Sequence, residues 1–284
     1  MIIDGRKIAA EIITDLQAKF TAQKVKKFMG AALVGPNPAS ENFLKQKAKV
    51  AAELGIEFRL YKLSSELTTD NLRQEIGRLA GVKSCGGFIV QLPLPKDVNL
   101  HYAMNAIPKE KDVDVLSEPA LGAFYTGRSK ILPPSVATVA ELLARYVTNL
   151  RNSAVVVIGA GFLIGRPVGF WLQNRVAELT VFDEHAPYLR EKLKDADVVV
   201  SGAGRANLFS AADLKSGAVV IDFGFSQIET KDEQGEMKKK IVGDFVPPDP
   251  RSHKLEAINY TPVPGGTGPI LVAKLFENFY LLNS

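Results

Sequence analysis

The chain has 284 residues, of which 46% are hydrophobic and 23% charged, with a formal net charge of +4. These values are ordinary for a globular protein of one large or two average domains. No apolar run approaches the roughly 20 residues that a membrane-spanning helix needs, and the start, "MIIDGRKIAAEI", lacks a signal-peptide pattern. The one cysteine, Cys85, excludes an internal disulfide and a cysteine-cluster metal site. We therefore expect a cytoplasmic protein.

The basic residues are spread along the chain and interleaved with acids, so a nucleic-acid-binding patch is not predicted. The dense run "MKKKIV" at 237–242 follows the acidic "ETKDEQGE", and the two indicate the ends of a solvent-exposed hairpin. A mildly basic surface suits a small anionic substrate. His101, His185 and His253 show no ligand spacing, and we expect no metal.

Apolar periodicity and turn residues predict alternating helices and strands, which is typical of an α/β fold with parallel sheets. Ser40 is the predicted N-cap of the second helix, and Gly55 is predicted to close it. The predicted helices are 6–20, 41–54, 70–79, 137–147, 163–173 and 268–282. The predicted strands are 28–34, 56–63, 86–91, 154–158, 179–182, 197–200 and 218–222.

Two series of these elements predict two α/β domains with a boundary around 115–140. The first domain spans 1–136 and is joined by the C-terminal helix 268–284. The second, 137–267, has the order expected of a Rossmann-like dinucleotide-binding domain.

A glycine-spaced turn, "VVVIGAGFLIGRP" (155–167), joins a predicted strand to a predicted helix. In this context Gly159 permits the tight turn, Gly161 lets backbone approach a pyrophosphate, and Gly165 lets the helix pack closely on the strand. The helix N-terminus supplies free N–H groups for phosphates. The alternative is an ordinary glycine turn in an α/β sheet.

Two acids, Asp183 and Glu184, follow the next strand, "ELTVF". A carboxylate at this place accepts hydrogen bonds from ribose hydroxyls and repels a 2′-phosphate, which favours NAD over NADP. The alternative is a solvated acid at the end of a strand.

Lys47 lies on one stripe of the predicted helix 41–54 with Phe43, Val50 and Leu54, whereas Lys45 and Lys49 lie opposite. A lysine on an inward face has a lowered pKa and can handle protons or orient water. The alternative is a lysine whose stem follows the edge of the stripe with its ammonium in solvent.

Three further stretches carry candidate polar or backbone groups. Gln91 ends a strand ahead of "LPLP", which places its amide at the carboxyl edge of the sheet or makes it a loop anchor. Asp112 and Asp114 lie on the same side of the chain if it is extended there. They are predicted equally well as ligand-binding residues or as turn formers. The loop "TPVPGGTGPI" (261–270) exposes backbone groups and suits a flat ring, although a plain connector is the alternative.

Taken together, the chain resembles the FolD family of bifunctional methylenetetrahydrofolate dehydrogenase/methenyltetrahydrofolate cyclohydrolases. The resemblance covers essentially the whole chain, in the family's order. It rests on "IIDGRKIA", "GPNPASENFLKQK", "GGFIVQLPLP", "PKEKDVD", "IGAGFLIGRPV", "GAVVIDFGF", "IVGD" and "TPVPGGTGP".

The resemblance implies a folate cleft between an α/β N-terminal domain and a Rossmann domain, and a homodimer. It implies oxidation of 5,10-methylenetetrahydrofolate with NAD, or NADP as the alternative, followed by hydrolysis to 10-formyltetrahydrofolate. The implied catalytic residues are Lys47, Gln91 and Asp114. The implied substrate-binding residues are Phe43, Lys47, Val90, Gln91, Leu92, Asp114, Pro264, Gly265 and Gly266. The implied cofactor-binding residues are Gly159, Ala160, Gly161, Phe162, Leu163, Ile164, Gly165, Asp183, Glu184 and Phe225.

Several positions depart from the family pattern. Phe43 replaces the usual tyrosine four residues before the lysine, which keeps ring stacking and loses a hydroxyl. "VLSE" follows Asp114 in place of Gly-Phe-His-Pro, and "PPSV" at 133–136 replaces Pro-Cys-Thr-Pro. Small Ala160 and Gly161, with "FDE" at 182–184, stand where NADP-using relatives contact the 2′-phosphate, which again favours NAD. The segment 226–240 is longer and more charged than usual.

Three functions therefore compete. The first is the bifunctional enzyme, the second is a dehydrogenase whose cyclohydrolase is weakened by Phe43, and the third is a non-catalytic paralogue. The joint presence of Lys47, Gln91 and Asp114 argues against the third.

Overall fold

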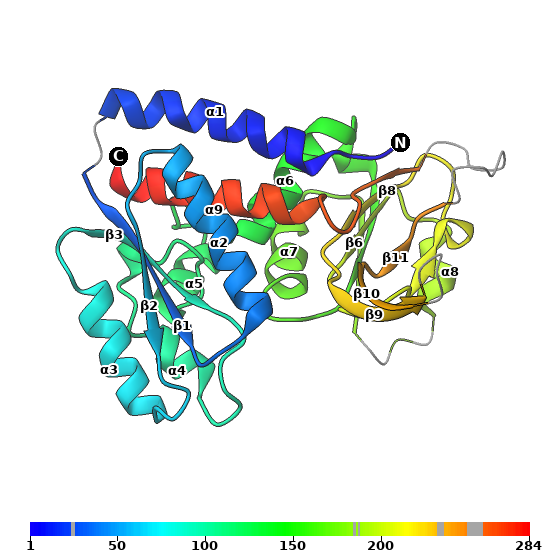
Figure 1. Cartoon of the computed structure of the whole chain (residues 1–284). Coiled ribbons are helices and arrows are strands. Elements are labelled where there is room, and N and C mark those ends of the chain that lie inside the picture. Colours follow the sequence, from blue (N-terminus) through cyan, green and yellow to red (C-terminus); the bar gives the residue numbers. More distant parts are fainter. Residues whose placement is uncertain (24–25, 184–185, 187, 232–235, 249–257) are drawn as a thin grey trace. The chain divides into compact units, whose positions relative to one another are not determined.

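The computed structural model describes residues 1–284 except 24–25, 184–185, 187, 232–235 and 249–257 (Figure 1). The chain divides into two compact units. The three-stranded unit comprises Ala9–Pro134 and Val272–Ser284, and the five-stranded unit comprises Met1–Ile8 and Ser135–Leu271. Each unit is named after its largest sheet, and each is described by itself.

The sheet of the three-stranded unit is parallel, with the order β2-β1-β3. Its strands are β1 (Phe28–Val34), β2 (Phe58–Leu63) and β3 (Cys85–Gln91). All seven residues of β1 are buried, as a continuous apolar run predicts. The strands predicted from the sequence are confirmed, with β2 beginning two residues later than expected. Because β1 pairs with β3 up to Leu33 opposite Gln91, their carboxyl ends meet at one edge.

Helices cover both faces of this sheet. On one face, α3 (Thr69–Ala80) and α4 (Leu100–Met104) share a core with Ala32, Phe88 and Val90. On the other, a side chain added at Gly87 would meet Phe279 of α9 (Thr267–Asn283) at 2.8 Å, so glycine is needed for this close approach. Helix α1 (Gly5–Gln23) packs along α9, where the rings of Phe20 and Tyr280 meet edge to face at 5.2 Å (Figure 1).

The sheet of the five-stranded unit is parallel, with the order β12-β8-β6-β4-β5. Its strands are β4 (Ala154–Ile158), β5 (Glu178–Phe182), β6 (Val198–Ser201), β8 (Val219–Asp222) and β12 (Asn259–Tyr260). The chain passes from β4 to β5 on one side and then to β6 on the other. The strand order therefore reverses at β4, and the crevice at the carboxyl end of such a strand is where α/β proteins bind ligands.

Three helices belong mainly to this unit: α6 (Pro134–Tyr146), α7 (Gly165–Leu172) and α8 (Leu189–Leu193). Helix α7 buries Val168 and Leu172. It is shorter than the predicted 163–173, because Ile164, with φ −121° and ψ −71°, is still outside helical geometry. Leu193 of α8 lies in a core cluster with Val156, Val199 and Val220 of the sheet.

The first residues of the chain extend the five-stranded sheet. The amide of Ile3 donates to the carbonyl of Tyr260 at 2.8 Å, and the amide of Tyr260 donates to the carbonyl of Met1 at 3.0 Å. These bonds place Met1–Ile8 in the five-stranded unit, whereas the sequence-based division assigned them to the first domain.

The charged segment after β8 forms an antiparallel hairpin of β9 (Ser226–Lys231) and β10 (Met237–Val242). Lys238, Lys239 and Lys240 are exposed, which confirms the predicted solvated hairpin. The remaining elements are α2 (Pro38–Glu53), α5 (Glu118–Tyr125), the 3-10 helices η1 (Lys109–Lys111), η2 (Leu150–Asn152) and η3 (Ala211–Asp213), and the paired short strands β7 (Phe209–Ser210) and β11 (Phe245–Val246).

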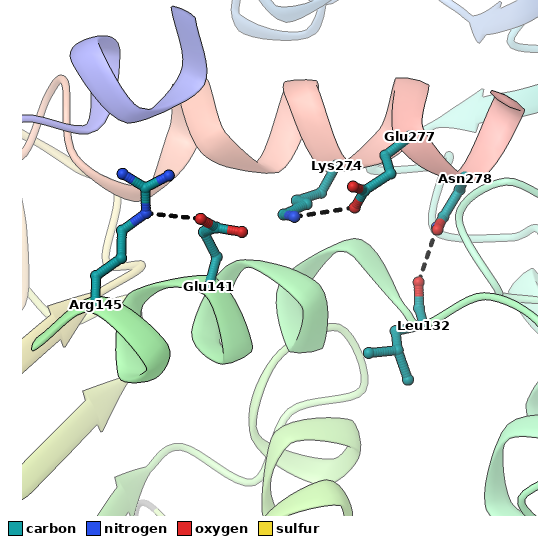
Figure 2. Close-up of polar contacts among 6 residues, drawn as sticks. All are labelled: Leu132, Glu141, Arg145, Lys274, Glu277 and Asn278. Carbon is teal, nitrogen blue, oxygen red and sulfur yellow. Dashed lines mark hydrogen bonds and ion pairs between the residues drawn. The ribbon is translucent and has the colours of Figure 1, made fainter. Parts of the chain in front are cut away.

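Ion pairs within single helices support α6 and α9 (Figure 2). In α6, Arg145 Nε lies 2.7 Å from a carboxylate oxygen of Glu141, one turn earlier. In α9, Lys274 Nζ lies 2.9 Å from Glu277. Pairs at these spacings each add a few tenths of a kcal/mol to a helix.

Among the described residues, no helix has both the length and the apolar character needed to cross a membrane.

Candidate active site

Helix α2 enters the site region directly after β1. Its N-cap is Asn37, whose Oδ1 accepts from the amide of Ser40 at 3.0 Å. The predicted N-cap, Ser40, is wrong: Pro38, in the first turn, needs no amide partner and starts the helix earlier. Ser40 is buried, and its hydroxyl donates to the carbonyl of Leu92 at 3.2 Å.

Lys47 lies on the inward face of α2. It is one turn from the buried residues Leu44 and Ala51, and it is half-buried. Its neighbours Lys45 and Lys49 are exposed. The helical period thus separated one inward lysine from two solvated ones, as predicted.

A hydrogen bond joins Lys47 to the end of β3. Lys47 Nζ donates to Gln91 Oε1 at 3.0 Å, although 44 residues separate them in the chain. Gln91 Nε2 donates in turn to the carbonyl of Leu92 at 2.9 Å. This second bond orients the amide so that its oxygen faces the lysine. Gln91 therefore holds the ammonium group in place.

Asp114 supplies the charge in this cluster. Burial lowers the pKa of Lys47 below its ordinary value, and the Asp114 carboxylate opposes that shift. Burial likewise raises the pKa of Asp114, and Lys47 opposes the rise. The two groups therefore act on each other, and the lysine remains easier to deprotonate than a solvated one.

The backbone next to Asp114 is fixed from two sides. Asp112 pairs with Phe88 in a parallel bridge, so the chain runs beside β3 toward Gln91. The amide of Asn278 in α9 donates to the carbonyl of Leu132 at 2.8 Å (Figure 2). It also donates to the carbonyl of Val113 at 2.8 Å. The structure thus brings Lys47, Gln91 and Asp114 together at one edge of the three-stranded sheet.

Asp112 has a different role from Asp114. Its Oδ2 accepts from Leu116 N at 3.0 Å and from the amide and hydroxyl of Ser117 at 2.8 and 2.6 Å. Its Oδ1 is buried without a hydrogen-bond partner among the described residues. Asp112 therefore acts as a turn former, one of the two roles predicted for Asp112 and Asp114.

The other substrate positions of this unit differ in what they offer. Phe43 is half-buried on α2. Val90 packs its side chain into the core. Leu92 contributes the carbonyl that anchors Gln91 and Ser40. Contact of these residues with a substrate stays a prediction.

The glycine loop of the five-stranded unit has the geometry expected of a dinucleotide loop. Gly159 has φ +91°, and a Cβ there would lie 2.8 Å from the carbonyl oxygen of Gly202. A Cβ on Gly165 would overlap the carbonyl oxygen of Gly159, whereas one on Gly161 would meet nothing within 4 Å. The turn and the helix contact thus require glycine at the outer positions, and open space lies in front of the middle one.

The flanking residues complete this loop. Leu163 is exposed, and its carbonyl accepts from the hydroxyl of Ser135 at 2.7 Å. Ala160, Phe162 and Ile164 are half-buried. The carbonyl of Ala160 accepts from Arg166 Nε at 2.9 Å. Helix α7 begins without a side-chain cap. The amides of Arg166 and Val168 already donate to the carbonyls of Gly161 and Ile164, both at 3.0 Å, and Pro167 has no amide hydrogen. The first turn therefore offers the N–H of Gly165 to a phosphate oxygen.

Asp183 lies at the carboxyl end of β5, exposed, next to the loop. The preceding residue, Phe182, accepts from Gly159 N at 2.8 Å, which ties the two strand ends together. Glu184 lies outside the described residues. Phe225 is 44% exposed beyond the end of β8. These positions fit a ribose and an aromatic ring beside a pyrophosphate loop.

The loop before α9 contains Pro264, Gly265 and Gly266. The Val263–Pro264 peptide is cis, and Gly265 has φ +102°. Gly266 is buried, where a Cβ would meet Thr261. The loop is therefore a tightly built turn, and its contact with a ring system stays a prediction.

Sequence reasoning missed two buried acids of the five-stranded unit, Asp222 and Asp244, which are 1% and 0% exposed. Both occur in stretches on which the resemblance rests, and each adjoins a strand near a glycine. An aspartate at a strand end near a glycine was the sequence feature that could have identified them. Within the described ranges, no group of three or more His, Cys, Asp or Glu side chains is placed to hold a metal ion.

Comparison with known proteins agrees with this arrangement. Residues 3–114 match the catalytic domain of tetrahydrofolate dehydrogenase/cyclohydrolase, and residues 133–283 match its NAD(P)-binding domain. The bifunctional protein FolD of Geotalea daltonii is 36% identical over 280 residues, which cover 98% of this chain and 96% of that protein.

Solved structures are similar over nearly the whole chain. The FolD enzyme of Campylobacter jejuni is 32% identical with a TM-score of 0.87, covering 100% of this chain and 98% of that one. The Trypanosoma brucei enzyme, complexed with NADP and an inhibitor, is 29% identical with a TM-score of 0.88, covering 99% and 96%. The expected α/β fold class with two domains is confirmed.

The candidate chemistry of the three-stranded unit therefore lies on polar side chains, Lys47 of α2, Gln91 of β3 and Asp114. That of the five-stranded unit lies on a backbone loop after β4. The fold, the domain matches and the relatives lead to one conclusion. The chain belongs to the tetrahydrofolate dehydrogenase/cyclohydrolase family, the bifunctional FolD enzymes of folate one-carbon metabolism, which are both NAD(P)-dependent oxidoreductases and hydrolases.

Proposed function

We propose that Lys47, Gln91 and Asp114 are the catalytic residues of both reactions, with NAD as the preferred oxidant. The reactions are oxidation of 5,10-methylenetetrahydrofolate to the 5,10-methenyl form and hydrolysis of that form to 10-formyltetrahydrofolate. One observation carries the proposal. Lys47 Nζ is held 3.0 Å from Gln91 Oε1 and has a pKa lowered by burial.

The hydrolytic step needs a group that takes a proton while a cation lies nearby. Water attacks the methenyl carbon, forming a C–O bond, and one of its protons passes to Lys47 Nζ. The C–N5 bond then breaks as the C=O bond forms: the remaining hydroxyl proton leaves to solvent, and N5 receives the proton held by Lys47. One proton is released overall. A lysine with a lowered pKa offers more neutral amine for the first transfer than a solvated one.

Gln91 and Asp114 adjust this lysine in different ways. The amide oxygen of Gln91 accepts from Nζ in either protonation state and so fixes its position. The Asp114 carboxylate limits the fall in the pKa of Lys47, which keeps the amine able to return its proton. We also propose that Asp114 accepts hydrogen bonds from the pterin, and that Phe43 stacks on it.

The oxidative step depends mainly on positioning. NAD(P), when bound, supplies the acceptor for the hydride that leaves the methylene carbon. The chain's own contribution is the open space at Gly161, the uncapped start of α7 and the tight contact between Gly159 and Gly165. These residues fit a pyrophosphate.

The preference for NAD rests on Asp183. Its exposed position at the end of β5, beside the glycine loop, suits hydrogen bonds from the ribose hydroxyls. A 2′-phosphate there would face a carboxylate, and residues 160 and 161 are alanine and glycine rather than basic residues. The basic side chain of Arg166, at the same loop, has its Nε bonded to the carbonyl of Ala160 at 2.9 Å.

We further infer that the protein is a cytoplasmic homodimer and that its product serves purine biosynthesis. The family resemblance supports the dimer and the pathway. The single cysteine, which is buried and unpaired, is consistent with a reducing compartment.

The test is to add methylenetetrahydrofolate with NAD or NADP in turn and to follow nucleotide reduction by absorbance. The decay of the methenyl product is then followed in a buffer that slows its spontaneous hydrolysis. We expect faster reduction with NAD, and methenyl loss that depends on enzyme. Faster reduction with NADP would overturn the cofactor preference. Reduction without enzyme-dependent decay would favour a dehydrogenase that Phe43 has deprived of the second activity.

Asp183→Asn sharpens the cofactor test. Removing the charge while keeping the size should raise kcat/KM for NADP relative to NAD by about tenfold, the effect of roughly 1.4 kcal/mol of repulsion. Asp195→Asn, an exposed acid elsewhere in the same unit, is the control and should leave the ratio unchanged.

A further inference from the structure

Two fully buried aspartates of the five-stranded unit have no part in the chemistry above. Asp222 ends β8, and Asp244 lies between β10 and β11. They are adjacent: the backbone amide of Asp244 donates to Asp222, and each carboxyl group approaches the glycine beside the other. A Cβ on Gly224 would overlap the carboxylate of Asp244, and one on Gly243 would overlap that of Asp222.

Asp244 holds the loop that follows β6. Its Oδ2 accepts from the hydroxyl of Ser201 at 2.7 Å and from the amides of Ala203 and Gly204 at 2.9 and 3.3 Å. Its Oδ1 accepts from the amide of Arg205 at 2.8 Å. One carboxylate thus receives four hydrogen bonds, one from the last residue of β6 and three from the loop after it, an arrangement that fixes the backbone there.

Asp222 holds the loops on either side. Its carboxylate accepts from Gly224 N at 2.7 Å and from Phe245 N at 2.9 Å. Its own amide donates to the hydroxyl of Thr261 at 2.8 Å, and its carbonyl accepts from the hydroxyl of Thr267 at 2.9 Å. Thr261 and Thr267 flank the turn that contains Pro264.

The loop held by Asp244 packs directly on the glycine loop. A Cβ on Gly159 would lie 2.8 Å from the carbonyl oxygen of Gly202 and 2.9 Å from the amide nitrogen of Ala203. A Cβ on Gly202 would lie 2.8 Å from the side chain of Ile164. With this little space, a shift of residues 202–204 displaces Gly159 or Ile164 as well.

We propose that Asp222 and Asp244 are positioning residues for NAD(P): together they hold the loops after β6, β8 and β12 in the arrangement that keeps the glycine loop open to the dinucleotide. The inference rests on the proposed use of that loop for NAD(P). It assigns a positioning role in nucleotide binding to two carboxylates that do not contact the reacting atoms.

The protonation of the pair agrees with this role. Burial raises the pKa of Asp222 to about 7, and the neighbouring Asp244 carboxylate adds to the rise. Asp244 is the charged side chain that acts on Asp222 within the described part of the chain. Below about pH 7 the protonated form of Asp222 predominates, which avoids two adjacent buried charges.

The test measures the Kd of NADH and NADPH by nucleotide fluorescence in the full chain, together with the melting temperature and cyclohydrolase activity without nucleotide. We expect Asp244→Asn to raise the Kd about 10- to 100-fold, the scale of an ångström-sized misplacement. Its KM for NAD(P) should rise more than its kcat falls. Cyclohydrolase activity should be retained, because that reaction needs no nucleotide.

The pH profile and three further variants complete the test. In the wild type the nucleotide Kd should change as pH passes through about 7, and Asp222→Asn should abolish that change. Ser201→Ala removes one of the four donors to Asp244 and should raise the Kd by a smaller factor. Asp213→Asn is the control, since its carboxylate accepts from the amide and hydroxyl of Ser210 at 2.8 and 3.1 Å and pairs with Arg190, rather than with residues 201–205.

The outcomes distinguish a failure of the positioning role from a failure of the proposed function. A folded Asp244→Asn with wild-type Kd values overturns the positioning role. If that variant does not fold, Ser201→Ala decides, and a wild-type Kd there overturns the role as well. Absence of NADH and NADPH binding by the wild type instead overturns the proposed function, and this inference with it.

Discussion

The three-stranded unit presents its candidate chemistry through side chains, whereas the five-stranded unit presents a backbone loop. In the first, Lys47 and Gln91 come from different elements and meet at 3.0 Å beside Asp114. In the second, Gly159 and Gly165 are required because a side chain at either position would collide with neighbouring backbone. A site of the first kind should lose rate when a functional group is removed. A site of the second kind should lose binding when an atom is added.

The largest effect is expected at Lys47. Lys47→Met keeps the length of the side chain and removes its amine, so cyclohydrolase activity should fall about 10²- to 10⁴-fold, the usual contribution of a general acid–base group. The dehydrogenase should fall less, because hydride transfer depends mainly on positioning. Both rates are measured with saturating nucleotide.

The control for this variant is Lys45→Met, which removes an exposed lysine two residues away on the same helix. It should retain both activities. Equal losses of activity in the two variants would show that the amine of Lys47 has no specific role in either reaction.

The second prediction adds atoms to the glycine loop. A methyl group at Gly165 would overlap the carbonyl oxygen of Gly159, so Gly165→Ala should destabilise the fold by about 1–3 kcal/mol, as overpacking does, and should abolish NAD(P) binding. Gly161→Ala meets nothing within 4 Å. It should therefore keep the wild-type melting temperature while raising the Kd of NADH about tenfold or more, by occupying the space that a pyrophosphate needs.

Gly122→Ala is the matched control, because a Cβ there also meets nothing within 4 Å and the residue lies in α5 of the other unit. Its nucleotide Kd should equal that of the wild type. Unchanged nucleotide binding in Gly161→Ala would remove the glycine loop from the proposed cofactor site.

The difference between the two kinds of site also explains what the sequence could predict. Buried strands such as β1 and β4 are continuous apolar runs, and their bounds were predicted to the residue. The inward position of Lys47 follows from the helical period alone. The glycine spacing is local as well, since Gly159 and Gly165 meet within a single turn.

Long-range partners are not contained in local patterns. The bond from Lys47 to Gln91 spans 44 residues and forms only because β1 and β3 are neighbours. Asp183, Asp222 and Asp244 all adjoin strands, yet the first is exposed and the others are fully buried. The sequence could not distinguish them, because burial depends on which loops cover each strand end. Asn37 displaced the predicted cap Ser40 for a local reason, the proline that starts the helix.

The third prediction concerns the pH dependence of stability in the five-stranded unit. The folded-state pKa of Asp222 is raised to about 7, above the ordinary value of an unfolded aspartate, about 3.9. The native state therefore binds a proton more tightly. Its contribution to stability is complete below the ordinary pKa and is lost as pH rises through about 7. The wild-type melting temperature should fall between pH 5 and about 8 by an amount that Asp222→Asn removes.

Thermal unfolding of both proteins across that range checks this prediction. Histidines elsewhere contribute equally to both curves, so the difference between the curves isolates Asp222. Parallel curves would mean that Asp222 has the same proton affinity in the folded and unfolded chain.

The smallest effect is expected at Phe43, where the resemblance implies a missing hydroxyl. Phe43 is half-buried on α2, one turn before Lys47. Phe43→Tyr keeps the ring and adds a group that can hydrogen-bond to the amine or to the attacking water. A hydrogen bond contributes about 0.5–1.5 kcal/mol, so the cyclohydrolase rate should rise about two- to tenfold. The dehydrogenase, which uses the ring for stacking, should change little. The ratio of the two activities at fixed pH is the measurement, because it cancels differences in active enzyme concentration. An unchanged ratio would show that Gln91 and Asp114 already orient Lys47 without the hydroxyl. A fall in the ratio would show that the site has been built around phenylalanine, with a hydroxyl there left unsatisfied.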